Sequence, residues 1–155
     1  MSFEGLAPVR FESVSAVTLT NTVDLGTRAT DGGNEYIYVY NAGNSQISKG
    51  HAAILSAATG YSVTVSSITM VDFALGMVKH STMATATYGW LLTKGFATFI
   101  AGANDSFAAG NPISLGIDGA FVYKTISTGF VSPAIGKAVQ ATASGVSAGY
   151  GYFSF

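Results

Sequence analysis

Short runs of β-forming residues, each ended by a turn-forming residue, constrain the fold of this chain more than any other feature. The turn signals lie about 8–12 residues apart. Gly60, Gly95, Gly102, Gly110 and Gly129 lie at or near the joints. This spacing is typical of a compact β-barrel or β-sandwich, in which short strands are joined by tight turns. The chain is therefore expected to be all-β.

The clearest predicted strand is Glu35–Asn41, which alternates aromatic and aliphatic residues. A period of two places Tyr36, Tyr38 and Tyr40 on one face and the intervening isoleucine and valine on the face expected to meet the core. The tyrosine face is open to three interpretations: an outer cross-strand ladder, a second buried face, or an interface with a partner. We take the tyrosines as candidate partner-binding residues.

The remaining strands are predicted from similar runs between breakers. Asp118-Gly119 separates two apolar runs and predicts a β-hairpin over residues 115–121. Ile68–Lys79 is the one segment left open to a helical turn. The other predicted strands are Ala52–Leu55, Tyr61–Ser66, Gly89–Leu92, Phe96–Ile100, Ile113–Leu115, Ala120–Ile126 and Gly149–Phe155.

The first 23 residues differ from the rest and predict an extended N-terminal arm ahead of a domain at residues 24–155. Phe3, Leu6, Val9 and Phe11 are spaced by small and polar residues, and β-branched residues follow them. Such a segment either folds back as a first strand or reaches a neighbouring subunit. We expect these four side chains to contact a partner.

Charge is sparse, at 10% of residues against roughly 25% in ordinary soluble domains. Two explanations are open: a surface rich in hydroxyl groups, or an oligomer whose interfaces have lost charge at their centres. The net charge is −1, and the seven basic residues are scattered along the chain. A basic stripe that follows a phosphate backbone is therefore not expected, and neither is a nucleic-acid partner.

The sequence offers no recognisable catalytic machinery, cofactor site or metal site. There is no cysteine, and neither His51 nor His80 has a second ligand at metal-binding spacing. The glycines form neither a phosphate loop nor a dinucleotide fingerprint, and the sequence has no Gly-x-Ser-x-Gly elbow. The start lacks the features of a secretory signal, and the uncharged C-terminus is broken by glycines, so neither end predicts a membrane segment. We expect a protein that is not an enzyme.

Trp90, the single tryptophan, is either a core anchor or an interface hot spot.

Several segments, in order, resemble the small capsid decoration (cement) proteins of tailed bacteriophages. The resemblance spans most of residues 24–155 and leaves residues 1–23 uncovered. The segments are Asp24-Leu-Gly-Thr-Arg28, Gly33-Asn-Glu-Tyr-Ile-Tyr-Val-Tyr40, Lys49-Gly50, Ala86-Thr-Tyr-Gly-Trp-Leu-Leu-Thr-Lys-Gly-Phe-Ala97 and Ser132-Pro-Ala-Ile-Gly-Lys-Ala-Val139.

The resemblance implies a homotrimer that binds the major capsid protein on the outer surface of the head and stabilises it against expansion and internal DNA pressure. It implies assembly in the bacterial cytoplasm, which the absence of cysteine fits. Two alternatives stay open. One is another virion module, either a head-fibre base or a receptor-binding knob. The other is a small monomeric β-barrel that binds an apolar ligand inside.

Overall fold

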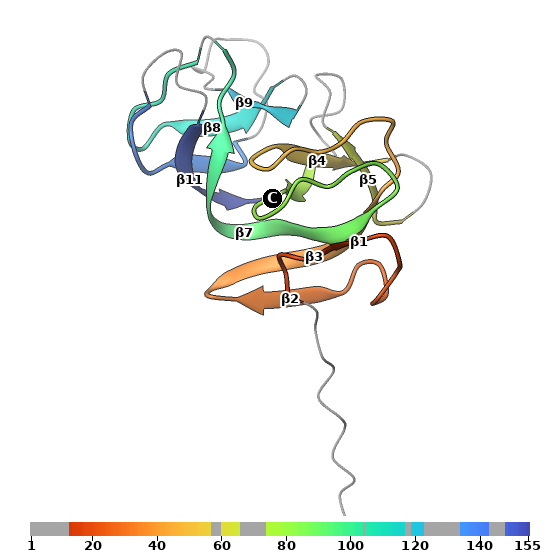
Figure 1. Cartoon of the computed structure of the whole chain (residues 1–155). Helices are drawn as coiled ribbons and strands as arrows, with labels where there is room; N and C mark the ends of the chain where they lie inside the picture. Colours follow the sequence, from red (N-terminus) through yellow and green to blue (C-terminus); the bar gives the residue numbers. More distant parts are fainter. Residues whose placement is uncertain are drawn as a thin grey trace, which may run out of the picture.

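The computed structural model describes residues 13–56, 60–65, 74–103, 105–116, 119–122, 134–142 and 148–155. These residues form an almost entirely β structure, as predicted (Figure 1). The strands are β1 (Val17–Thr18), β2 (Arg28–Asp31), β3 (Asn34–Asn41), β4 (Ala52–Leu55), β5 (Ser62–Val65), β6 (Ala74–Met77), β7 (Tyr88–Ile100), β8 (Pro112–Leu115), β9 (Phe121–Val122), β10 (Gly136–Ala138) and β11 (Ala148–Ser154).

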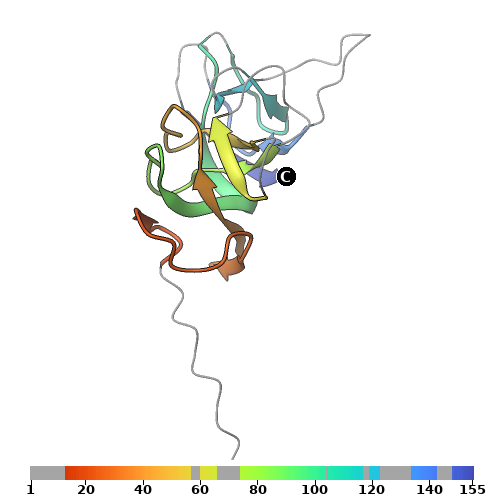
Figure 2. The ribbon, with the colours of Figure 1, turned by 90° about the vertical axis from the view of Figure 1, so that its right-hand side faces the viewer.

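Five strands close into a small barrel in the order β3-β5-β4-β6-β7, and β7 pairs back onto β3. The β3–β5 pair is parallel and the other four pairs are antiparallel; Figure 2 shows β5 (yellow) beside β3 (orange). The barrel interior is filled by apolar side chains, among them Ile37, Val39, Val63 and Leu91. Small barrels of this kind hold a packed core and not a channel.

A second layer of strands continues from β7 in the order β7-β11-β10-β8-β9. Its inner face packs against the outside of the barrel through an aromatic cluster, in which Phe99 makes edge-to-face contacts with Phe107, Phe121 and Phe153 at centroid distances of 5.1–5.8 Å. Edge-to-face pairs are the favoured arrangement for aromatic rings in a core. The outer face of the barrel and the second layer therefore share one core cluster, and the barrel interior forms a second one.

The strand β7 joins the two layers, and here the predicted pattern was wrong in one respect. Gly89–Leu92 and Phe96–Ile100 were expected as separate strands, but β7 runs through Gly95 without a break. Gly95 has φ +130°, and the register of β3 against β7 shifts beside it, so the strand bends where a turn was expected. The first half of β7 consequently pairs with β3, and the second half pairs with β11 (Figure 1).

Two open predictions are resolved by the pairing. The hairpin over residues 115–121 is confirmed, since β8 and β9 pair antiparallel with Leu115 opposite Phe121, although residues 117–118 lie outside the described residues. The described end of the segment left open to a helical turn is β6, a strand. Residues 68–73 of that segment lie outside the described residues.

The predicted boundary between residues 23 and 24 does not coincide with a structural boundary. Val17 and Thr18 pair with β7, and Val14 and Val23 pack against the core. Residues 13–23 thus belong to the domain, because their apolar side chains find a partner on its surface. Phe3, Leu6, Val9 and Phe11 lie outside the described residues, so partner contact by them stays a prediction.

Candidate functional site: an exposed aromatic face

The last strand, β11, has two glycines on its buried face and two tyrosines on its outward face. Its inward positions include Gly149 and Gly151, while Tyr150 and Tyr152 point outward. A Cβ at position 149 would overlap the ring of Phe99, and one at position 151 would lie 2.7 Å from Cδ1 of Ile113. The large core residues on neighbouring strands therefore leave room only for glycine at these two positions. Phe153 enters the core from the same face, while Tyr150 and Tyr152 are directed outward.

Phe96 of β7 completes the outward cluster, because it lies directly opposite Tyr152 in the antiparallel register. The ring of Phe96 is 6.0 Å from that of Tyr150, with planes 14° apart, and 5.0 Å from that of Tyr152. Phe96 is 46% exposed, Tyr150 is 38% exposed and Tyr152 is partly exposed. We call Phe96, Tyr150 and Tyr152 the aromatic face.

The neighbours of the aromatic face are one exposed apolar residue and two lysines. Val139, which is exposed, follows β10 and donates its backbone N–H to the carbonyl oxygen of Tyr150. Lys137 lies opposite Tyr152 and is exposed. Lys94, two residues before Phe96, pairs with Glu35 at 3.2 Å, and this hydrogen bond raises the pKa of Lys94. An apolar centre with a polar rim is typical of a binding surface.

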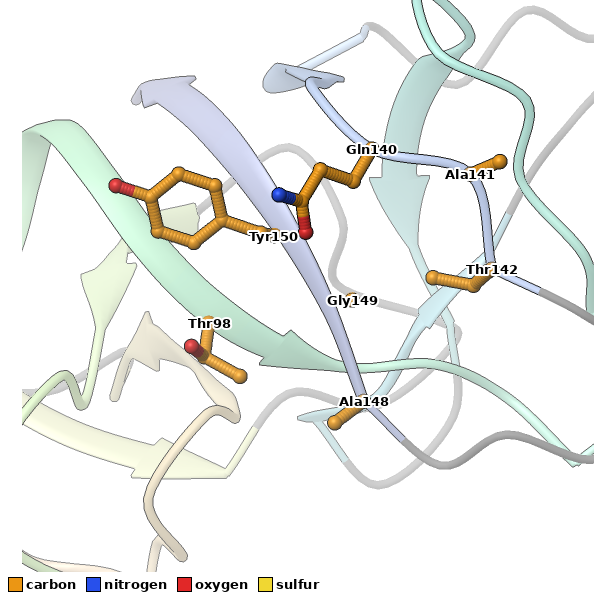
Figure 3. Close-up of a pocket in the computed structure, with 7 residues that line it drawn as sticks. All are labelled: Thr98, Gln140, Ala141, Thr142, Ala148, Gly149 and Tyr150. Carbon is orange, nitrogen blue, oxygen red and sulfur yellow. The ribbon is translucent and has the colours of Figure 1, made fainter.

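A groove of about 480 Å³ adjoins the aromatic face (Figure 3). The side chains of Tyr150, Gln140 and Thr98 approach it from β11, from the segment after β10 and from β7 respectively. The residues that line the groove are Thr98, Gln140, Ala141, Thr142, Ala148, Gly149 and Tyr150. The groove therefore offers hydroxyl and amide groups beside an aromatic ring.

The tyrosines predicted as partner-binding residues are brought together with Trp90, but inside the protomer. Tyr36 and Tyr38 are each 1% exposed, Trp90 is 4% exposed and Tyr40 is half-buried. The ring of Tyr38 lies 5.1 Å from that of Trp90, and the ring of Tyr40 lies 4.8 Å from that of Tyr88. Of the three interpretations of this tyrosine face, the second buried face describes Tyr36 and Tyr38. The aromatic contacts between β3 and β7 form a cross-strand ladder that lies within the protomer. Contact of these residues with a partner stays a prediction.

Both faces of β3 are buried because other segments of the chain pack over its tyrosine face. β2 pairs with β3, and Val14, Val23 and Leu25 pack against the cluster that contains Tyr38 and Trp90. The phenolic oxygen of Tyr38 is bonded to Thr22 Oγ1 at 3.0 Å, which satisfies its polar end. The position of Trp90 agrees with a core anchor.

A second group of polar side chains surrounds Tyr36 at the end of β6. The hydroxyl oxygen of Tyr36 lies 3.1 Å from Nε2 of His80, and Nζ of Lys79 lies 6.0 Å from the Tyr36 ring. Burial raises the pKa of Tyr36 and lowers the pKa values of Lys79 and His80. Because Tyr36 is buried, we assign this group a structural role.

The described part of the chain holds no cluster of three or more histidine, cysteine or acidic side chains suited to a metal ion. Within the same residues, no helix has the length and apolar character needed to cross a bilayer.

Comparison with known proteins identifies a shared fold. No family model and no curated protein sequence matches the chain. Among solved structures, the chain is similar to the crystal structure of the head fiber gp8.5 N base of bacteriophage phi29, with a TM-score of 0.54 and 14% sequence identity. The likeness covers 77% of this chain and 92% of that chain. At this identity the likeness shows the fold alone.

Reasoning from the sequence missed the aromatic face. The signal that identifies it is Gly149-Tyr-Gly-Tyr-Phe153, in which glycines and tyrosines alternate. The two tyrosines lie on one face of this strand, and the two glycines and Phe153 lie on the other. Which side is buried depends on Phe99 and Ile113, which come from other strands.

Proposed function

We propose that this chain is a structural virion protein of a tailed bacteriophage, which binds other protein subunits on the phage head. The observation that carries the proposal is the fold shared with a head-fibre base over most of both chains. Independent support comes from the segments that resemble those of decoration proteins and follow the same order along the sequence. Two of them, Gly33–Tyr40 and Ala86–Ala97, form most of the paired strands β3 and β7.

In its more specific form, the proposal is a decoration (cement) protein that binds the major capsid protein on the outer surface of the head as a homotrimer. The sparse charge of the chain supports a surface shared with neighbours. Because each trimer contacts several coat subunits, expansion or rupture of the head must break many contacts together. The proposed action is mechanical, and we propose no catalytic step.

A head-fibre base is the second candidate, and the similarity to the phi29 head fibre favours it. In this second form, the chain would be the base of a fibre on the head. The third alternative, a barrel with an internal apolar ligand, is disfavoured because the interior is occupied by Ile37, Val39, Val63 and Leu91 among others.

Co-sedimentation of the purified chain with heads that lack it tests the proposal. We expect saturable binding, and heads decorated with the chain should release DNA at a higher temperature than bare heads. Light scattering is expected to give about three times the 15.9 kDa mass of one chain. A monomer without affinity for heads would overturn the proposal.

Deletion of residues 1–12 tests the role of the N-terminal segment. We expect weaker attachment to heads with the unfolding midpoint of the domain retained, because the described core begins at Val14. Undiminished attachment would show that Phe3, Leu6, Val9 and Phe11 do not contact the coat.

A further inference from the structure

The aromatic face exposes an amount of apolar surface that is small for a protein interface. At about 200 Å² per aromatic residue, the exposed fractions of its two most exposed members, Phe96 and Tyr150, correspond to roughly 170 Å². A stable protein–protein interface covers about 800 Å² on each partner. The area is suited to a short run of sugar rings, which present one flat, weakly apolar face at a time.

The rings are held in place, as stacking on a sugar requires. Phe96 and Tyr150 lie on adjacent strands with planes 14° apart, and the ring of Phe96 also packs against that of Tyr152. Gly149, beside Tyr150, packs on Phe99. The C–H groups of a sugar face carry partial positive charge, and the face of an aromatic ring carries partial negative charge. Aromatic side chains also lose little conformational entropy on binding, since only two side-chain angles are fixed.

The groove beside Tyr150 supplies the polar half of such a site. Its volume of about 480 Å³ lies in the range of about 300–1,000 Å³ that is usual for small-ligand sites. The amide of Gln140 and the hydroxyl group of Thr98 approach it, whereas the hydroxyl group of Thr142 accepts the backbone N–H of Phe107. Amides and hydroxyls both donate and accept hydrogen bonds, as the hydroxyl groups of a sugar require.

The charge around the site favours a ligand with acidic groups. No acidic side chain lines the groove. Glu35, near the aromatic face, is paired with Lys94. Lys137 is exposed beside Tyr152 and makes no ion pair with any residue in the described ranges. A cation beside aromatic rings complements a carboxylate carried on a sugar.

We propose that the aromatic face and the adjoining groove bind an acidic polysaccharide. Phe96 and Tyr150 stack on its sugar rings, Gln140 and Thr98 bind its hydroxyl groups, and Lys137 pairs with a carboxylate. The site is a second function of the chain, and it is independent of whether the chain acts as a cement protein or as a fibre base.

Fluorescence anisotropy with the full chain tests the site, with labelled oligogalacturonate as the acidic probe and a neutral maltooligosaccharide of equal length as the control. We expect saturable binding of the acidic probe. Phe96→Ala and Tyr150→Ala should each weaken it about tenfold, the equivalent of one aromatic stacking contact. Tyr150→Phe keeps the ring and should retain binding, and Lys137→Gln should reduce the acidic probe to the affinity of the neutral one.

Leu19→Ala is the matched control, because Leu19 is 81% exposed in the segment between β1 and β2 and should leave binding unchanged. Three results would overturn the proposal. One is the absence of saturable binding, and another is equal affinity for the acidic and neutral probes. The third is a change in the mass of the assembly with Phe96→Ala or Tyr150→Ala, which would assign the aromatic face to contact between copies.

Discussion

At the scale of single residues, one buried amide connects two loops of the barrel. Nδ2 of Asn41 lies 3.0–3.2 Å from the carbonyl oxygens of Ser45, Met83 and Ala84, and its Oδ1 accepts the N–H of Gly43. Asn41 is fully buried. Its side chain thus links the two loops where β3 ends, and these bonds satisfy an amide that is itself buried.

We predict that Asn41→Ala lowers the free energy of unfolding by about 2–4 kcal/mol, since the hydrogen bonds of one buried side chain are lost together. Urea denaturation measures the change. Asn44→Ala is the control, because Asn44 is exposed in the same loop and should stay within about 0.5 kcal/mol of the parent. Equal effects of the two substitutions would contradict a structural role for the Asn41 amide.

His80 gives the fold a dependence on pH with a defined sign. Burial, followed by the charge of Lys79, lowers the pKa of His80 below its ordinary value of 6.5 in the folded state. The unfolded chain therefore binds the proton more readily, and stability present above pH 6.5 is lost as the pH falls through the lowered pKa. Asp31 opposes this effect in part.

We predict that the free energy of unfolding falls between pH 7 and pH 5, and that His80→Gln makes this fall smaller. Glutamine retains a hydrogen-bonding group for the Tyr36 hydroxyl, which lies 3.1 Å from Nε2 of His80. Urea titrations at a series of pH values measure the slope. An unchanged slope in the variant would exclude His80 as its source.

At the scale of elements, the bend in β7 allows one strand to serve two layers. Gly95 has φ +130°, and the side chain of Asn34 occupies the space where a Cβ would lie. Oδ1 of Asn34 accepts the backbone N–H of Phe96 at 3.0 Å, which fixes the strand beyond the bend. Gly95 and Asn34 thus both contribute to the bend in β7.

We predict that Gly95→Ala destabilises the domain by about 1–3 kcal/mol, because it adds backbone strain and displaces Asn34. Gly60→Ala is the control, since a Cβ there meets no atom within 4 Å. Thermal unfolding compares the two variants. A loss no larger at position 95 than at position 60 would mean that the bend does not require glycine.

The individual strands were largely predictable from the sequence, whereas their connections were not. Ala52–Leu55 forms a strand with the predicted bounds, since local β-propensity and a following turn decide it. The continuity of β7 depends on Asn34, which is 61 positions away from Gly95 in the sequence. The burial of Tyr36 and Tyr38 depends in the same way on β2 and on Val14, Val23 and Leu25.

At the scale of the whole molecule, the barrel and the second layer present two contrasting aromatic groups. Tyr38 and Trp90 are covered by the chain itself, while Phe96 and Tyr150 are exposed on the second layer. Both groups lie on strands in which successive side chains alternate between the two faces of the sheet. Sequence alone does not distinguish them, because exposure is decided by which segments pack over each sheet face.

Cryo-electron microscopy of virions whose genome encodes this chain tests the structural role most directly. We expect density on the outer surface of the head that the five-stranded barrel and its second layer fit. For a cement protein this density lies at capsomer junctions, and for a fibre base it lies at the root of a fibre. A well-resolved head surface without such density would contradict it.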